Sequence, residues 1–183
     1  MFTIYESQIL AILSDNPGTE YYLSELGGML GKHPGVFQWG INSLEKQGWI
    51  LSRKRGSQRL FKINSGHPLF KEIKAVVRKT VGTEARLKKA VHGISGIKTA
   101  FIYGSYAKDS MRQDSDIDLM VVADDLKAED KLVDGLARVE KELGREVNYK
   151  LYSEHDFKQR RKNKDPFLAE VLSGKYIVLK DDL

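Results

Sequence analysis

Two short apolar runs separated by a polar loop constrain the fold of this chain more than any other stretch. The first run, Ala100–Tyr103, ends at Gly104 and Ser105, and the second begins at Asp116 after ten intervening residues. This pattern predicts a strand, a tight turn into a short helix, a loop and a second strand. Gly104 can adopt a positive φ, and Ser105 would open a helix whose free N–H groups favour anions. The turn is therefore interpreted as a phosphate-binding cradle.

The second run carries a pair of acids. Asp116 and Asp118 are two residues apart on a predicted strand, so both carboxylates point to one face while Ile117 and Leu119 point into the core. Mg²⁺ is usually held by one or two carboxylates together with substrate phosphate oxygens. Paired acids at a strand end, beside a phosphate-binding turn, therefore predict a Mg²⁺ site.

The order Gly-Ser, ten residues, Asp-x-Asp resembles the signature of the minimal nucleotidyltransferases of the DNA polymerase β superfamily, from about Leu87 to the C-terminus. The resemblance implies a small mixed sheet with flanking helices, two Mg²⁺ ions, and a nucleoside triphosphate such as ATP that donates a nucleotidyl group to an acceptor hydroxyl. The nucleotide-binding candidates are Gly104, Ser105, Lys108 and Arg112, and the metal-binding and catalytic candidates are Asp116 and Asp118. The alternative for Lys108 and Arg112 is that they are surface charges of a solvated loop.

One acid of the family pattern is missing. These enzymes carry a third carboxylate on a later strand, where it completes the metal site and can take the proton of the attacking hydroxyl. The later strand is predicted at residues 145–152, and the matching position is Asn148, whose amide cannot accept a proton. Glu146 lies about 7 Å away along the same strand face and would replace it only with a register shift. The resemblance therefore implies weak or absent transfer, with Asn148 at a catalytic position.

Composition narrows the possible classes of protein. In 183 residues there is no cysteine, which excludes disulfides and thiolate metal sites, and the four histidines lack ligand spacing. No run approaches the roughly 18 apolar residues of a membrane span, and the N-terminus has no signal pattern. We expect a cytoplasmic protein without membrane contacts. The formal net charge of +5 is compatible with a polyanionic partner.

The N-terminal third of the chain predicts three helices followed by a hairpin. Apolar residues recur at helical spacing over residues 4–13, from a capping Ser24 to Leu30, and from Pro34 to Gly48. Two strand-like stretches, residues 49–53 and 59–64, then flank a Gly-Ser turn. The pattern resembles a winged helix-turn-helix domain. That resemblance implies that the third helix enters the major groove of double-stranded DNA and that the wing contacts its backbone.

The third helix and the wing supply the DNA-binding candidates. They are Gln38, Asn42 and Lys46 on the helix, and Arg53, Lys54, Arg55 and Arg59 in the wing. Because Trp39 and Gly40 are atypical of a base-reading helix, the alternative is a domain that mediates protein contacts or homodimerisation.

The whole chain is therefore expected to be α+β and to have three parts: a winged helix-turn-helix domain at residues 1–66, a connecting helix at 67–92 and a nucleotidyltransferase-like domain at 93–183. Three functions compete. The first is a transcriptional regulator that binds DNA and senses or uses a nucleotide, with weak or no transfer. The second is an antitoxin-like enzyme that adenylylates a partner protein, and the third is a binding or dimerisation module without turnover.

Overall fold

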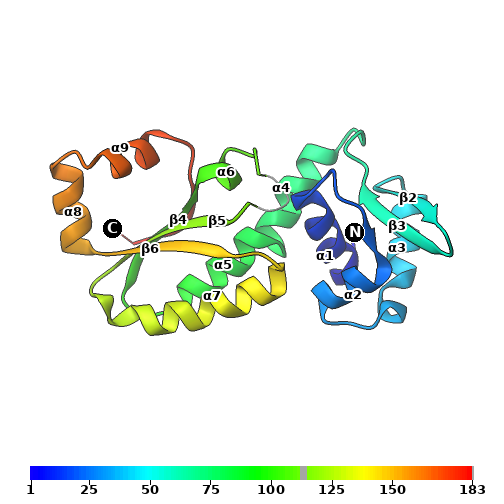
Figure 1. Cartoon of the computed structure of the whole chain (residues 1–183), viewed down its shortest axis with the longest axis horizontal. Helices are drawn as coiled ribbons and strands as arrows, with labels where there is room; N and C mark the ends of the chain where they lie inside the picture. Colours follow the sequence, from blue (N-terminus) through cyan, green and yellow to red (C-terminus); the bar gives the residue numbers. More distant parts are fainter. Residues whose placement is uncertain (112–114, 183) are drawn as a thin grey trace. The chain divides into compact units, whose positions relative to one another are not determined.

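The structure is a computed structural model that describes residues 1–111 and 115–182. The chain divides into two compact units, Met1–Ala85 and Arg86–Leu183, which are described separately (Figure 1). Each unit combines helices with a sheet of its own, which confirms the α+β prediction. None of the described helices is long and apolar enough to cross a membrane.

The first unit is a winged helix-turn-helix fold. Its elements are α1 (Ile4–Asp15), β1 (Tyr21–Tyr22), α2 (Leu23–Leu30), the 3₁₀ helix η1 (Pro34–Val36), α3 (Gln38–Lys46), β2 (Ile50–Arg55), β3 (Gln58–Ile63) and α4 (Phe70–Thr80). The strands form an antiparallel sheet in the order β1-β3-β2, so the hairpin β2-β3 is the predicted wing. The next helix, α5 (Thr83–His92), begins in this unit and continues into the second.

One apolar core holds the first unit together. Residues from α1, α2, α3, the sheet and α4 bury their side chains in it: Ile9, Leu10, Leu13, Leu26, Phe37, Ile41, Leu44, Ile50, Phe61, Ile63 and Val77. The first helix is capped by Thr3, whose hydroxyl accepts the Glu6 N–H while the Glu6 carboxylate accepts the Thr3 N–H. This reciprocal capping box satisfies two backbone donors that a helix start leaves free.

Two helix boundaries differ from the prediction. Ser24 lies inside α2 rather than at its cap, because the chain already turns at Tyr22, whose N–H is bound by the Glu25 carboxylate at 2.6 Å. The predicted third helix is divided. Phe37, with φ −120° and ψ 5°, interrupts the helical geometry between η1 and α3.

A small ionic cluster lies where α1, α4 and the start of α5 meet. The Arg78 Nε is 3.6 Å from Asp15 Oδ1 and 3.7 Å from Glu84 Oε1, and the Thr83 hydroxyl donates to Asp15 at 2.8 Å. The Glu84 side chain is only 11% exposed. Burial raises its pKa, although the positive charges of Arg78 and Lys79 oppose the shift. The ionised form of Glu84 is therefore disfavoured by folding.

Replacing Glu84 by Gln should weaken the pH dependence of stability. A raised pKa means that the folded protein binds this proton more tightly than the unfolded chain. The resulting stability is fully present below the ordinary value of 4.5 and is lost as the pH rises through the raised pKa. Urea unfolding of the full chain should therefore show a smaller loss of stability between about pH 4 and pH 7 in Glu84→Gln. The exposed acid Glu72 gives the control, Glu72→Gln, which should behave as wild type. An unchanged pH dependence in Glu84→Gln would contradict this account.

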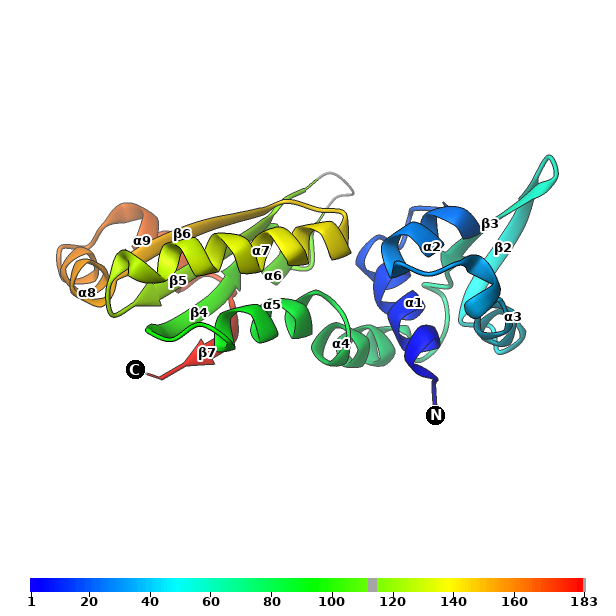
Figure 2. The same ribbon diagram turned by 90° about the horizontal axis from the view of Figure 1, so that it is seen from below.

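The second unit is built on a four-stranded mixed sheet, as predicted. Its elements after α5 are β4 (Ile97–Tyr103), α6 (Gly104–Ala107), β5 (Ile117–Ala123), the 3₁₀ helix η2 (Leu126–Ala128), α7 (Glu129–Leu143), β6 (Val147–Ser153), α8 (Glu154–Lys162), α9 (Pro166–Ser173) and β7 (Ile177–Asp181). The strand order is β6-β5-β4-β7, and β5 and β6 run parallel while the other pairs are antiparallel. Figure 2 shows α5 and α7 alongside the sheet.

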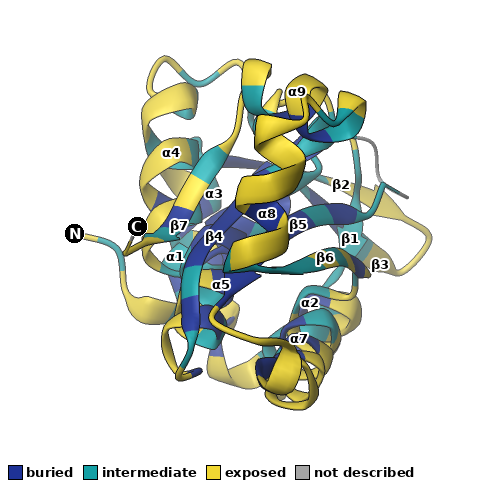
Figure 3. Cartoon of the chain, turned by 90° about the vertical axis from the view of Figure 1, so that its left-hand side faces the viewer, coloured by how far each residue is buried: buried dark blue, intermediate teal, exposed yellow. Residues whose placement is uncertain are grey.

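The alternation along β5 decides which side chains reach which face of the sheet. Ile117, Leu119 and Val121 pack into a core with α5 and α7, whereas Met120 and Val122 pack on the opposite face against α8 and α9. Both faces are therefore covered, and β5 is nearly continuously apolar, as a doubly buried strand requires. Figure 3 shows the buried strands β4 and β5 beside the exposed surface of α8. By the same alternation, Asp118 belongs to the face that α9 covers.

Candidate functional site

The glycine turn and one of the paired acids are in direct proximity. Gly104 follows β4 with φ +71°, a conformation that favours glycine. A Cβ atom added to Gly104 would lie 2.1 Å from the Asp118 Oδ2, much closer than two atoms can approach. Two independent reasons therefore favour glycine at position 104: its positive φ, and the Asp118 carboxylate, which leaves no space for a Cβ atom.

The start of the short helix α6 corrects the expected role of Ser105. α6 spans Gly104–Ala107 with Tyr103 at the cap position, and the Gly104 carbonyl accepts the Lys108 N–H at 3.2 Å. Ser105 consequently lies inside the first turn, one residue after the glycine, instead of opening the helix. It still directly follows the turn that faces Asp118.

The candidate catalytic residues Asp116, Asp118 and Asn148 lie together at the neighbouring ends of β5 and β6. In the parallel register Asp118 pairs with Asn148, and the Asn148 Nδ2 donates to the Asp116 Oδ2 at 2.9 Å. Glu146 lies before β6, where its carbonyl accepts the Ile117 N–H. Asn148, rather than Glu146, is therefore the β6 side chain beside the paired acids.

The electrostatics of this group favour a cation. Burial raises the pKa of Asp118, and the negative charge of Asp116 raises it further. Two neighbouring carboxylates, one of them partly buried and with a raised pKa, are a donor set that fits Mg²⁺ when substrate phosphate oxygens complete it. Within residues 1–111 and 115–182, no three His, Cys, Asp or Glu side chains converge on a common point. The third side chain beside Asp116 and Asp118 is that of Asn148, which carries an amide and not a carboxylate.

A hollow of about 150 Å³ opens beside Gly104. It is lined by Tyr103, Gly104, Lys108, Phe167, Glu170, Val171, Gly174 and Lys175. The Phe167 ring meets Tyr103 edge-on at 5.9 Å between centroids, and the Lys150 Nζ lies 5.2 Å from the Phe167 centroid. Burial, the Asp118 charge and Tyr152 raise the pKa of Tyr103 to about 12, so its hydroxyl stays protonated at neutral pH.

The sequence reasoning missed the α9 side of this hollow. Phe167 and Glu170 lie on α9, and Lys175 follows it, far from the Gly-Ser turn in sequence. These three residues belong to no recognisable motif. Lys150, which lies over the Phe167 ring, is different: it follows Asn148 by two residues on the same strand face, so its position near the site could have been predicted. Lys108 lines the hollow, and its role in phosphate binding stays a prediction. Arg112, the other candidate cation, lies outside the described residues.

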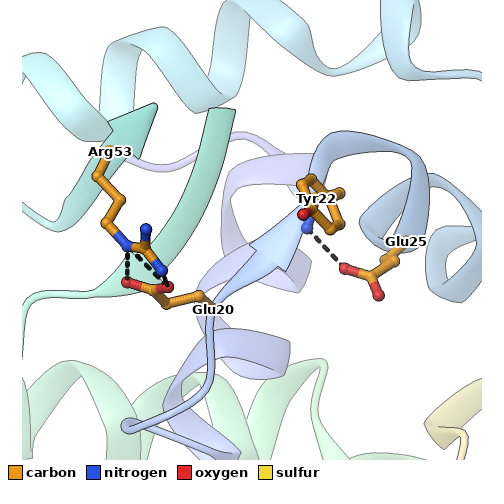
Figure 4. Close-up of polar contacts among 4 residues, drawn as sticks. All are labelled: Glu20, Tyr22, Glu25 and Arg53. Atoms are coloured by element: carbon orange, nitrogen blue, oxygen red, sulfur yellow. Dashed lines mark hydrogen bonds and ion pairs between the residues drawn. The ribbon is translucent and has the colours of Figure 1, made fainter. Parts of the chain in front are cut away.

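Two of the four candidate arginines and lysines of the wing already have acidic partners. The Arg53 Nε is 2.8 Å and 2.9 Å from the two Glu20 carboxylate oxygens, as Figure 4 shows. The Arg59 Nη2 donates to Glu45 Oε1 at 2.7 Å and to the Ser52 hydroxyl at 2.8 Å. Glu20 and Glu45 lie outside the wing in sequence. The sequence of the hairpin alone therefore does not show that Arg53 and Arg59 are paired with acids.

The remaining candidates divide between the hairpin tip and α3. Lys54 and Arg55 are exposed at the tip, and Lys46 is exposed in the last turn of α3. Gln38 and Asn42 line a hollow of about 350 Å³ between α2, α3 and β3. The full lining is Tyr22, Leu23, Ser24, Pro34, Gln38, Ile41, Asn42, Gln58, Arg59 and Phe61.

A mixed sheet whose glycine turn faces paired carboxylates defines the second unit as a nucleotidyltransferase domain. The model of the family described as polymerase beta, nucleotidyltransferase, matches residues 86–183, which is more than half of the chain. The chain therefore belongs to the polymerase beta nucleotidyltransferase family. No curated protein matched the chain.

Three solved structures illustrate the similarities found. Reduced HlyU from Vibrio cholerae is 24% identical, with 42% of this chain and 72% of that chain covered at a TM-score of 0.34. A toxin-antitoxin structure with AMP-PNP is 18% identical, with 54% and 73% covered at a TM-score of 0.40. A nucleotidyltransferase-like protein from Sulfolobus solfataricus is 19% identical, with 42% and 68% covered at 0.28. The family assignment rests on the family model and not on these three.

Proposed function

We propose that this protein is a DNA-binding, transcriptional-regulator-like protein whose nucleotidyltransferase domain binds Mg²⁺ and a nucleoside triphosphate, with slow or absent nucleotidyl transfer. The observation that supports this most directly is the position of Asn148. Its amide lies beside Asp116 and in register with Asp118, where the family resemblance expects a third carboxylate. In this proposal the chain supplies the groups for nucleotide binding but lacks the carboxylate that would accept a proton.

The residues of the chain have separate roles in this proposal. The backbone N–H groups after Gly104 and the Ser105 hydroxyl would bind phosphate oxygens, and Lys108 would neutralise the outer phosphates from the wall of the hollow. Asp116 and Asp118 would hold Mg²⁺. Bound Mg²⁺ supplies charge stabilisation to the transferring phosphoryl group. Asn148 can donate a hydrogen bond but cannot take the acceptor's proton, and loss of such a general base typically costs about 10² to 10⁴-fold in rate.

The proposal assigns DNA binding to the winged unit. A helix-turn-helix with an adjacent hairpin is a geometry that can place one helix in the major groove and the wing on the backbone. Lys54 and Arg55 at the exposed tip are the first candidates for phosphate contacts, because Arg53 and Arg59 are bound to Glu20 and Glu45. Exposed ion pairs are weak, so the two arginines can also exchange a carboxylate for a phosphate at small cost.

Removing Lys54 and Arg55 should weaken duplex binding in a salt-dependent way. Each lost phosphate contact should lower the slope of log affinity against log salt by about 0.9, so Lys54→Ala/Arg55→Ala should lower it by about 1.8. Fluorescence anisotropy with a random-sequence duplex over a salt series measures this slope. Lys131→Ala/Lys141→Ala removes the same charge from α7 of the other unit and should leave the slope unchanged. Equal flattening in both pairs, or no binding to any duplex at low salt, would contradict the assignment.

A second candidate function is an antitoxin-like enzyme that adenylylates a partner protein. The spacing of the Gly-Ser turn and the paired acids supports it, and Gly104 lies against Asp118 as a shared site for phosphate and metal would require. Incubation of the full chain with α-labelled ATP and Mg²⁺ in a cell lysate tests it. Prompt labelling of one protein, absent in Asp116→Ala/Asp118→Ala, would favour the enzyme, and no labelling at all would favour the regulator.

A further inference from the structure

The helix α3 exposes a large aromatic side chain. Trp39 is 87% exposed in the first turn of the helix, although Phe37, Ile41 and Leu44 around it are fully buried. The buried residues fix which side of α3 faces the core of the unit. Trp39 therefore points to solvent because of the helix orientation, and a change to this side chain leaves the core intact.

The helical period separates the exposed residues of α3 into two groups. Gln38 and Asn42 line the hollow toward β3. Trp39 and Lys46 are seven residues apart and share the outward stripe of the helix. Glu45, the acid of α3, is turned to the hairpin, where it binds Arg59 and Ser52. The outward stripe thus presents an indole and an ammonium group.

The first unit also exposes cations outside this stripe. Lys32 is exposed in the turn that precedes η1, and Lys54 and Arg55 are exposed at the hairpin tip. Such a surface complements a polyanion, and the major groove of a duplex admits a single α-helix. A thymine presents a C5-methyl group there, and apolar side chains distinguish thymine from the other bases by contact with it.

Although Trp39 is atypical of a base-reading helix, we propose that it determines sequence specificity by packing its indole ring against a thymine C5-methyl group in the major groove. This inference rests on the proposed DNA binding of the winged unit. In this arrangement Lys46, seven residues further along the same stripe, contacts a phosphate of the DNA backbone. Gln38 and Asn42 line the hollow beside the wing, whereas the indole lies on the outward stripe of the helix.

The experiment compares thymine with uracil, which differs from it by the missing methyl group. Duplexes are first selected from a random library by the full-length protein, and each dT of the best duplex is then replaced by dU. At the contacted position the replacement should weaken wild-type binding by about fourfold, the equivalent of one buried methyl group. Trp39→Ala should abolish this dT/dU difference and leave the salt slope unchanged, and Trp39→Phe should retain a smaller difference.

Several results would overturn the inference. Trp39→Ala that selects the same sequence with the same dT/dU difference would show that another residue reads the base. Sedimentation that shows a wild-type dimer and a Trp39→Ala monomer, with the dT/dU difference unchanged, would assign Trp39 to an interface between copies of the chain. Absence of any duplex binding by wild type at low salt would instead reject the DNA-binding proposal itself. Circular dichroism should confirm that Trp39→Ala remains folded, as its exposure requires.

Discussion

Replacing Asn148 by Asp is expected to raise the initial rate of nucleotidyl transfer by about 10² to 10⁴-fold. Asn148 already lies in register with Asp118 and beside Asp116, so the new carboxylate would reach the position from which a proton can be taken. The rate is measured as labelled product formed from α-labelled ATP and Mg²⁺ in a lysate. Affinity for Mg²⁺-ATP should change much less than the rate, because phosphate binding depends on other residues.

The same substitution has a readout that does not depend on transfer. Asn148→Asp replaces a hydrogen bond to Asp116 by repulsion between two carboxylates, so the second unit should be destabilised without Mg²⁺ and should recover when Mg²⁺ is added. Thermal unfolding with and without Mg²⁺ measures this. Glu146→Gln is the matched control and should alter neither the rate nor the Mg²⁺ response. Brisk transfer by the wild type, lost in Glu146→Gln, would show that Glu146 is the third acid.

Loss of the paired acids should abolish Mg²⁺-dependent nucleotide binding. Asp116→Ala/Asp118→Ala removes both carboxylates, and Gly104→Ala should have the same effect by a different route. The new Cβ would collide with the Asp118 Oδ2 and force the carboxylate away from the turn. Isothermal titration calorimetry with Mg²⁺-ATP should detect binding by the wild type and none by either variant.

Gly144 supplies a control for the backbone strain of Gly104→Ala. It ends α7 with φ +62°, but a Cβ at that position would meet no atom within 4 Å. Gly144→Ala should therefore cost a similar backbone strain of about 1 kcal/mol without loss of Mg²⁺-ATP affinity. Unchanged affinity in Asp116→Ala/Asp118→Ala would reject these acids as the metal site. Equal loss in both glycine variants would mean that general destabilisation, rather than the collision, removes binding.

Features with a short-range cause were predictable from the sequence. The strands β4 and β5 follow from two apolar runs, and the turn between them follows from the positive φ that Gly104 can adopt. The capping box at Thr3 and Glu6 is likewise encoded three residues apart. The boundary at Ser24 was wrong because the competing cap at Tyr22 uses the Glu25 carboxylate, a contact that propensity alone does not rank.

The sequence by itself thus determined the α+β class, the glycine turn and the amide of Asn148 on a strand beside the paired acids, because each depends on neighbours within one strand or turn. Tertiary structure alone decided which distant groups meet. It placed Asp118 against Gly104, brought Phe167 to the same hollow, and gave Arg53 its partner Glu20. Such pairings depend on strand register and helix packing, which are set by the whole core and not by any local pattern.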